Sequence, residues 1–228
     1  MAIYVTGDTH HKSDIEKLHD SVWFYENEIP LNDYVIICGD CGALWFGDER
    51  DKSLLDDFYS KLNCKVLFVD GNHENFNALE RYDVEVWNGG RVHKIRENIY
   101  HLMRGQVYNI EGITIFTFGG AKSIDKTYRK FNVDWWQQEM PNEIEYQSAL
   151  NNLAKVGYKV DYVLSHCAAT STIKRLNLLF GNDELTDWFE ELEKRLEYKH
   201  WYFGHYHMDI IIDDKHTCLY NWIVKIDE

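Results

Sequence analysis

Residues 65–76 read KVLFVDGNHENF, and they join a strand-like segment directly to a polar one. The first five residues are mostly apolar and β-branched or aromatic, which predicts a buried strand. Gly71 and Asn72 are ordinary turn residues, so the change of character could mark a turn alone. Alternatively, Asn72 and His73 present a donor atom and a proton carrier at the end of a sheet. The residues that follow the other strands separate these two interpretations.

The first half of the chain alternates between strand and helix patterns. Predicted strands cover residues 3–5, 34–38 and 65–69, and helical stripes cover residues 14–27, 50–62 and 74–81. This order predicts parallel strands joined by right-handed crossovers. The second half is expected to hold strands 99–109, 113–118, 161–164 and 200–203, helices 142–156 and 183–197, and a hairpin-like meander over 210–212 and 217–226. We therefore expect a mixed α/β fold in which two sheets pack together with helices outside.

Composition narrows the classes of function. At 228 residues the chain is expected to form one domain over residues 1–228. Its net charge of −14 disfavours long nucleic acids and anionic membranes, whose binding depends on Lys and Arg. Neither a membrane-spanning apolar run nor a signal-peptide pattern is present. Five scattered cysteines predict a reducing cytoplasm, and the Cys38/Cys41 spacing is more typical of packing than of a redox or zinc-thiolate site.

Five predicted strands are followed by Asp, His or Asn side chains. These are Asp8 and His10, Asp40, Asn72 and His73, His166, and His205 and His207. Because the carboxyl ends of parallel strands gather at one edge of a sheet, these side chains are expected to converge. Any one of them alone would be read as a turn or a cap. Five in the same register favour a binding site.

The converging groups are two carboxylates, one amide and several imidazoles, with no thiolate. Such oxygen and nitrogen donors suit Mn, Fe, Zn, Co or Ni better than Ca, which prefers oxygen alone. Seven or more candidate donors exceed the four that a tetrahedral zinc site requires. A centre of two divalent ions, about 3.5–4 Å apart and bridged by a carboxylate, accounts for the excess.

The ordered motifs resemble those of the calcineurin-like metallophosphoesterases. They are D-x-H at residues 8–10, G-D at 39–40, G-N-H-E at 71–74, His at 166 and G-H-x-H at 204–207. The resemblance implies a four-layer αββα fold, a two-sheet sandwich flanked by helices. It implies one metal ion held by Asp8, His10, Asp40 and His207, and a second held by Asp40, Asn72, His166 and His205. Manganese is the expected metal, with Fe, Zn, Co and Ni as alternatives.

The same resemblance implies hydrolysis of a phosphate mono- or diester on a small or nucleotide-like substrate. A hydroxide bridging the metals would attack the phosphorus in line while the cations neutralise the ester. His73 follows a ligand without being one, so it is expected to act as general acid, with Asp70 or Glu74 orienting its ring. Phosphoprotein phosphatases of this superfamily carry Arg where this chain has Asp70, which argues against that activity.

Substrate contacts are less constrained by the pattern. Residues 119–130 follow another strand end, where Arg129 is the candidate phosphate clamp and a solvated loop is an equal alternative. His11 follows a proposed ligand and is a second candidate. Trp135 and Trp136 could form an aromatic wall, although burial is the commoner fate of such residues.

Two other functions stay open at this point. The same core could serve a metal-dependent nuclease acting on short oligonucleotides, or a non-catalytic binding scaffold. A scaffold would be expected to lose His73 or several ligands, and this chain keeps all of them. The oligomeric state is left open.

Overall fold

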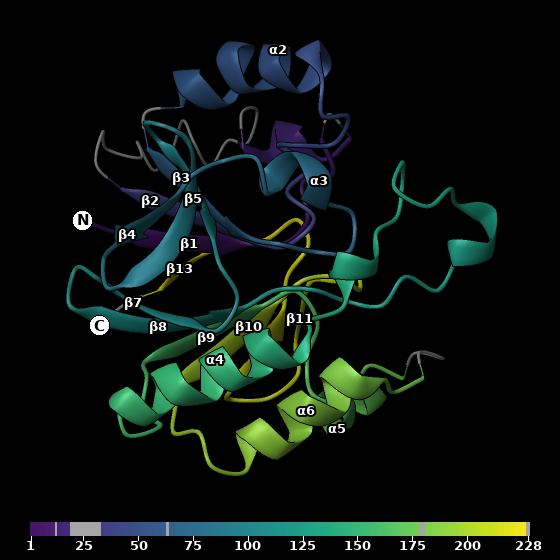
Figure 1. Cartoon of the computed structure of the whole chain (residues 1–228). Coiled ribbons are helices and arrows are strands. Elements are labelled where there is room, and N and C mark those ends of the chain that lie inside the picture. The colour runs from purple at the N-terminus through teal and green to yellow at the C-terminus, as the bar shows by residue number, and fades with distance from the viewer. Residues whose placement is uncertain (12, 19–32, 63, 178–180, 227–228) are drawn as a thin grey trace.

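Two β-sheets lie face to face in the computed structural model, which describes residues 1–11, 13–18, 33–62, 64–177 and 181–226 (Figure 1). The seven-stranded sheet contains, in spatial order, β13 (Ile223–Ile226), β1 (Ile3–Thr6), β2 (Tyr34–Cys38), β3 (Lys65–Val69), β6 (Ile99–Leu102), β5 (Gly90–Arg96) and β4 (Val84–Trp87). The six-stranded sheet contains β11 (Ile210–Ile211), β12 (His216–Cys218), β10 (His200–Phe203), β9 (Tyr162–Ser165), β8 (Ile113–Phe118) and β7 (Gln106–Ile110).

Helices cover the outer face of each sheet. The α-helices are α2 (Glu49–Asp57), α3 (Phe76–Leu79), α4 (Glu143–Lys155), α5 (Thr170–Arg175) and α6 (Glu184–Glu193). Short 3-10 helices are η1 (Ile15–Leu18), η2 (Tyr59–Lys61), η3 (Lys126–Tyr128) and η4 (Gln137–Glu139). In Figure 1, α2 lies above the seven-stranded sheet and α4, α5 and α6 lie below the six-stranded one. This arrangement confirms the predicted αββα layers.

Three apolar clusters fill the spaces between the four layers. Alternate residues of β2 face opposite sides: Ile36 packs in the cluster between the sheets, whereas Ile37 packs with Leu54 of α2. The third cluster joins Val163 of β9 to Phe189 of α6. Because both faces of the central strands are buried, these strands are apolar along their whole length.

The register of the parallel strands brings their carboxyl ends together. Strand β2 pairs with β1 through Thr6 and Ile37, and with β3 through Cys38 and Val69. In the other sheet, β9 pairs in parallel with both β8 and β10. The loops that follow these strands therefore start at a common edge of the sandwich.

One long strand prediction is wrong, and the predicted C-terminal meander holds only for the antiparallel pair of β11 and β12. Residues 99–109 form β6 in one sheet and β7 in the other, separated at Gly105, whose φ is +69°. Residues 217–226 likewise divide between β12 and β13, which belong to different sheets. Arg104, Gly105 and Gln106 interrupt the first stretch and Tyr220 and Asn221 the second, so both breaks carried a local signal that the prediction passed over.

The structure also contains elements that were not predicted. Strands β4 and β5 form an antiparallel hairpin around Asn88 and Gly89, whose φ values are +48° and +92°. An Asn-Gly pair between strands is a strong hairpin signal, so this element was readable from the sequence. Helix α5 was missed as well. The helix expected over residues 14–27 starts as η1, and its later part lies outside the described residues.

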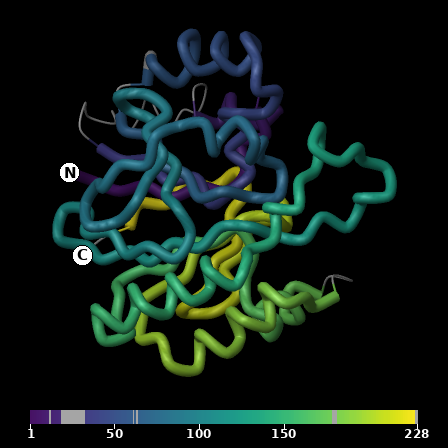
Figure 2. The backbone as a smooth tube through the Cα atoms, in the orientation of Figure 1, coloured from purple at the N-terminus to yellow at the C-terminus, as the bar shows by residue number. Residues whose placement is uncertain are grey.

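The segment between β8 and α4 projects from the body of the molecule at the right of Figure 2, where it is teal to green. We call residues 119–136 the arm. None of the helices in the described part of the chain has the length and apolar character that a bilayer crossing requires.

Candidate metal centre

The loops after β1, β2, β3, β9 and β10 bring the predicted side chains into one cluster. Its members are Asp8, His10, Asp40, Asn72, His73, His166, His205 and His207. The main-chain N–H of His205 donates to Asp8 Oδ2 at 3.0 Å, although the two residues are far apart in the sequence. Convergence at the strand ends therefore holds, and the interpretation of residues 71–73 as a turn alone does not.

Asp40 lies in the middle of the cluster. Its Oδ2 is 3.4 Å from His10 Nε2 and 3.3 Å from His166 Nε2. Its Oδ1 accepts a hydrogen bond from the main-chain N–H of His73 at 2.7 Å. The carboxylate therefore lies between two imidazoles that come from different sheets.

Two groups of three donors are close enough to share an ion. One contains Asp8, His10 and His207, and the other contains Asp8, Asp40 and His166, with the donor atoms of each group within 4.8 Å of one another. Nitrogen and oxygen ligands lie about 2.0–2.2 Å from a bound zinc-like ion, so groups of this size fit one. The carboxylate and imidazole chemistry fits Mn, Fe or Zn.

Two further predicted donors flank the second group. Asn72 Oδ1 is 3.1 Å from His166 Nε2, and the ring of His205 has its centroid 4.9 Å from that of His166. The orientation of the Asn72 amide is fixed by a hydrogen bond, which its Nδ2 donates to Ser123 Oγ at 3.1 Å.

Four of the cluster residues have strained backbones. The φ angles of His10, Asp40, His205 and His207 are +39°, +47°, +69° and +50°. Non-glycine residues rarely occupy this region, at a cost of roughly 1–3 kcal/mol each, and they concentrate at functional sites. The positive φ angles direct these side chains into the cluster. Their energetic cost is not explained by a role in stability alone.

Glycines make the close approach possible. A Cβ atom on Gly39 would lie 2.1 Å from His166 Nδ1, and one on Gly71 would lie 2.0 Å from Asp40 Oδ1. Gly39 also has a φ of +88°, which side chains disfavour. Both positions require glycine, because any side chain would displace a candidate ligand.

The charges of the cluster depend on one another. Burial raises the pKa of Asp8, and the nearby Asp40 raises it further. Burial opposes ionisation of Asp40 as well, but His166 holds the pKa of Asp40 well below its usual value. Although burial acts in the opposite direction, Asp40 raises the pKa of His166 to about 9. Two buried carboxylates thus share a site in which a bound cation would favour ionisation of both.

His73 lies at the rim of the cluster, beside the arm. Its Nε2 is 3.3 Å from Arg129 Nη2, and its ring centroid is 5.7 Å from that of Trp45. A guanidinium can only donate, so His73 Nε2 is the acceptor in this contact. Burial lowers the pKa of His73, and the Arg129 charge adds to this effect against the opposing charge of Asp40.

The expectation that Asp70 or Glu74 orients the His73 ring is wrong. Both carboxylates are buried and bind other groups. Asp70 Oδ2 accepts from Arg104 Nε at 2.8 Å, and Glu74 Oε1 accepts from the main-chain N–H of Cys41 at 2.7 Å.

The two predicted substrate contacts differ in placement. Arg129 reaches the cluster from the arm, fixed by a 2.7 Å ion pair with Asp125. His11 lies next to helix α2 instead: its Nε2 is 4.0 Å from Asp51 Oδ1, and its ring contacts Phe46 edge-on. Arg129 is therefore beside the candidate ligands, and a substrate role for His11 stays a prediction.

Several contacts of the cluster were not anticipated. Asp14 Oδ2 lies 2.6 Å from His10 Nδ1, and the spacing of four residues could have suggested the pair. Ser123 holds Asn72 and donates in turn to Glu139 Oε2 at 2.7 Å. No local signal marks Ser123 or Glu139, because both depend on the path of the arm.

The cysteines pack in the interior as expected, and so does one of the two neighbouring tryptophans. All five cysteines are free and buried, and burial raises the pKa of Cys41 to about 12, so its thiol stays protonated. Trp136 is buried, as the commoner fate predicted. Trp135 lies under the Lys126 ammonium, whose Nζ is 4.8 Å from its ring centroid.

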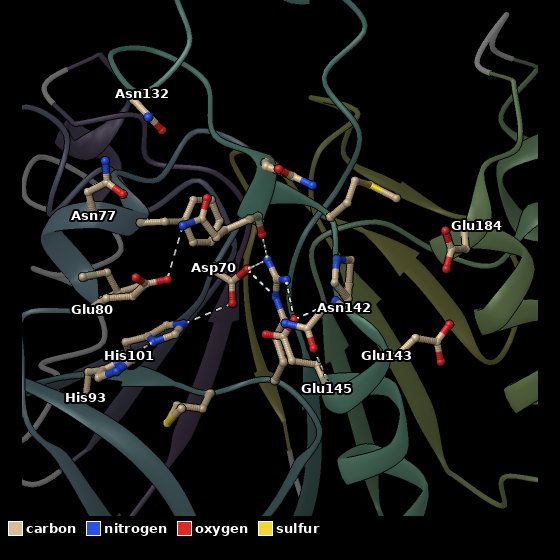
Figure 3. Close-up of a pocket in the computed structure, with 18 of the residues that line it drawn as sticks. Asp70, Asn77, Glu80, His93, His101, Asn132, Asn142, Glu143, Glu145 and Glu184 are labelled. Atoms are coloured by element: carbon tan, nitrogen blue, oxygen red, sulfur yellow. Dashed lines mark hydrogen bonds and ion pairs between the residues drawn. The ribbon is translucent and has the colours of Figure 1, made fainter.

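Beside the cluster lies a cavity of about 990 Å³, shown in Figure 3. Asp70 lines it together with Arg104, His101 and His93. His93 and His101 stack face to face, with their Nδ1 atoms 3.0 Å apart. In the figure a dashed line joins His101 to Asp70. Asp70 also forms an ion pair with Arg104, so its buried charge is balanced within this wall.

A comparison with protein families agrees with the motifs. No curated protein sequence matches the chain. Among solved structures, the phosphopantetheinyl hydrolase of Mycobacterium tuberculosis is similar, with 14% sequence identity, a TM-score of 0.49, and coverage of 99% of this chain and 95% of that one. The calcineurin-like phosphoesterase family matches residues 1–209, a range that includes all eight cluster residues. The chain therefore belongs to the calcineurin-like phosphoesterase family.

Proposed function

We propose that the chain is a dinuclear metal-dependent phosphoesterase that hydrolyses a phosphomonoester or phosphodiester of a small or nucleotide-like substrate. The observation that best supports this is the position of Asp40. Its Oδ2 lies 3.4 Å from His10 and 3.3 Å from His166, two residues that belong to different donor groups. A carboxylate in this position can serve two ions at once.

The proposed ligand sets are those that the family motifs imply, and the two donor groups of the structure contain five of their seven members. The first ion would be held by Asp8, His10, Asp40 and His207, and the second by Asp40, Asn72, His166 and His205. When bound, divalent ions such as Mn²⁺ supply positive charge to a phosphate ester and lower the pKa of coordinated water.

Arg129 is the proposed phosphate clamp of the chain. Its Nε is engaged by Asp125 and its Nη1 donates to the main-chain oxygen of Asp134 at 3.1 Å, which leaves Nη2 directed at His73. A guanidinium held in this way presents an N–H group at the edge of the ligand cluster, where the phosphoryl oxygens of a substrate would lie.

His73 is the proposed proton donor to the leaving oxygen. Its Nδ1 is buried and has no hydrogen-bond partner among the described residues, so Nε2 is the nitrogen that can exchange a proton with a substrate. In the structure Nε2 accepts from Arg129. For His73 to donate, Arg129 must move its hydrogen bond from the ring to the substrate phosphate, and Nε2 must take up a proton from solvent in its place. Binding of the phosphate by Arg129 and proton donation by His73 are thus coupled.

Turnover of chromogenic esters tests the proposal. Protein freed of metal with a chelator and reloaded with Mn²⁺ should hydrolyse p-nitrophenyl phosphate or bis(p-nitrophenyl) phosphate, and the chelated protein should not. Comparison of the two esters separates monoesterase from diesterase activity. Protein shown to hold two ions per chain yet inactive on both esters, and on a panel of nucleotide and cyclic nucleotide substrates, would contradict the proposal.

A further inference from the structure

The C-terminal segment lies outside the family match, which ends at residue 209, yet it reaches the proposed first ion site. Strand β13 pairs with β1 as far as Thr6, which lies opposite Ile223. The loop that carries Asp8 begins directly after Thr6. This pairing places Tyr220 against the candidate ligands. The ring of Tyr220 stacks on His207, with centroids 4.7 Å apart and an interplanar angle of 8°.

Tyr220 also acts on a second ligand through Asp14. The Tyr220 hydroxyl donates to Asp14 Oδ1 at 3.0 Å, and the other oxygen of Asp14 lies 2.6 Å from His10 Nδ1. A carboxylate on one ring nitrogen of a histidine fixes the orientation of the ring and directs the other nitrogen outward. Here the other nitrogen, Nε2, faces Asp40 at 3.4 Å.

Tyr220 is itself firmly placed. Its main-chain N–H donates to Asp209 Oδ1 at 2.7 Å, and its main-chain oxygen accepts from the Lys17 ammonium. The same ammonium donates to the main-chain oxygens of Asp8 at 2.6 Å and Gly7 at 2.9 Å. Lys17 therefore ties the backbone of one candidate ligand to that of Tyr220.

Two ligands of the proposed second ion are held by residues that precede the C-terminal segment. His166 and Asn72 are fully buried, and they are held by the main-chain oxygen of Cys38 at 2.8 Å and by Ser123. At the first site His207 is exposed and His10 is half-buried. The first site is thus the more open one, and its imidazoles depend on contacts from beyond residue 209.

We infer that Tyr220 is a positioning residue that sets the affinity of the first metal site, by stacking on His207 and by holding Asp14 against His10. The inference rests on the proposed dinuclear centre. Through Tyr220, the C-terminal segment would raise the affinity of the first site for its metal ion. The second site should keep its affinity when Tyr220 is replaced, because His166 and Asn72 are held by Cys38 and Ser123.

Titration of metal-free protein with Mn²⁺, followed by isothermal calorimetry and by the electron paramagnetic resonance signal of free Mn²⁺, tests this inference. Outer partners of metal ligands typically change affinity by about 10–100-fold. Tyr220→Ala should weaken one of two sites by this factor and leave the other unchanged, and Asp14→Asn should weaken the same site. Tyr220→Phe keeps the stacked ring and should have a smaller effect, of a few-fold.

Tyr34→Phe is the matched control. Its hydroxyl also donates to a carboxylate, Glu111 Oε1 at 3.3 Å, but it belongs to β2 and to the apolar cluster between the sheets. Both Mn²⁺ affinities should equal those of the wild type. Wild-type affinities in Tyr220→Ala, or equal weakening of both sites, would overturn the inference. Failure of the wild type to bind two ions would instead refute the dinuclear centre on which it rests.

Discussion

Two buried aspartates follow neighbouring parallel strands, yet their surroundings differ. Asp40 follows β2 and Asp70 follows β3, and each is about 1% exposed. In the described part of the chain, the groups close to the Asp40 carboxylate are the imidazoles of His10 and His166 and a main-chain N–H. Asp70 contacts one imidazole, His101, at 3.1 Å, and a guanidinium as well.

The guanidinium makes the difference. Arg104 donates to Asp70 from Nε and from Nη2, and it also binds the main-chain oxygen of Gln138 at 2.7 Å. Burial would raise the pKa of Asp70, but Arg104 keeps it below its usual value. The Asp70 charge is therefore compensated by the protein itself. At Asp40, the imidazoles of His10 and His166 can bind a metal instead.

The comparison shows how a structural carboxylate differs from a candidate ligand when both are fully buried. A permanent cation satisfies Asp70, because two N–H groups of Arg104 donate to Oδ2, and removing either partner would leave a buried charge unpaired. Around Asp40, the imidazoles of His10 and His166 lie at 3.4 and 3.3 Å, and the backbones of Asp40 and His10 are strained, which leaves room for a shared ion. The two aspartates should therefore respond differently to the same substitution.

The largest effect is expected for Asp40→Asn. Removing the charge from the shared ligand should release both ions and reduce turnover by more than the roughly 100-fold that loss of an outer partner can cost. Metal content per chain, measured by elemental analysis, should fall together with kcat. An Asp40→Asn protein with two ions and normal turnover would show that the cluster has been misassigned.

His73→Ala comes next, because it separates proton transfer from metal binding. Loss of a general acid typically lowers kcat by about 10²–10⁴-fold, and the ions should remain bound. His93→Gln is the matched control on the Asp70 side of the comparison, where its Nδ1 is 3.0 Å from His101 Nδ1. That variant should keep the wild-type turnover per folded chain. Equal losses of turnover in both variants would argue against the role of His73.

Asp70→Asn should affect stability and spare metal binding. The substitution leaves Arg104 buried without its counter-charge, and breaking a buried pair costs about 3–5 kcal/mol of unfolding free energy. Guanidinium unfolding curves measure this loss, and folded protein should still hold two ions. If the variant lost its ions at unchanged stability, Asp70 would belong to the metal centre after all.

Much of this arrangement was predictable from the sequence, because the central strands and the residues after them obey local rules. Strands β2 and β3 were predicted with their observed ends, and register then brings Asp40 and Asn72 together. Glycines at 39 and 71 were readable as points of close approach. The family motifs supplied the order of the ligands.

The remaining contacts depend on long-range packing that no short window contains. Asp70 was noted for standing where phosphoprotein phosphatases have Arg, but its pairing with Arg104 arises from the crossing between β6 and β7, which was read as one strand. Tyr220 reaches His207 through the pairing of β13 with β1, an assignment that the predicted meander had wrong. Apolar periodicity does not say which sheet a buried strand joins.

A smaller effect is expected on the melting temperature when Mn²⁺ is added to metal-free protein. A ligand at 100 times its Kd stabilises the folded state by about 2.7 kcal/mol per site, so the melting temperature should rise. The rise should persist in Asp70→Asn, whose site is intact, and disappear in Asp40→Asn. Differential scanning calorimetry measures both shifts. Equal shifts in the two variants would erase the distinction between the two aspartates.

The smallest effect is expected on KM, and it separates Arg129, beside His73, from Arg104, beside Asp70. The Arg104 side chain is 4% exposed and bound to Asp70, whereas that of Arg129 is 19% exposed and directs Nη2 at His73. Arg129→Lys keeps the charge but loses the planar fork, so KM should rise by about tenfold, the loss of roughly one charge-assisted hydrogen bond. Unfolding free energy should change little, since the exposed ion pair with Asp125 contributes at most about 1 kcal/mol. Steady-state kinetics on the ester that the wild type prefers measures KM. An unchanged KM would place the phosphate away from the arm and leave Arg129 as a partner of His73 alone.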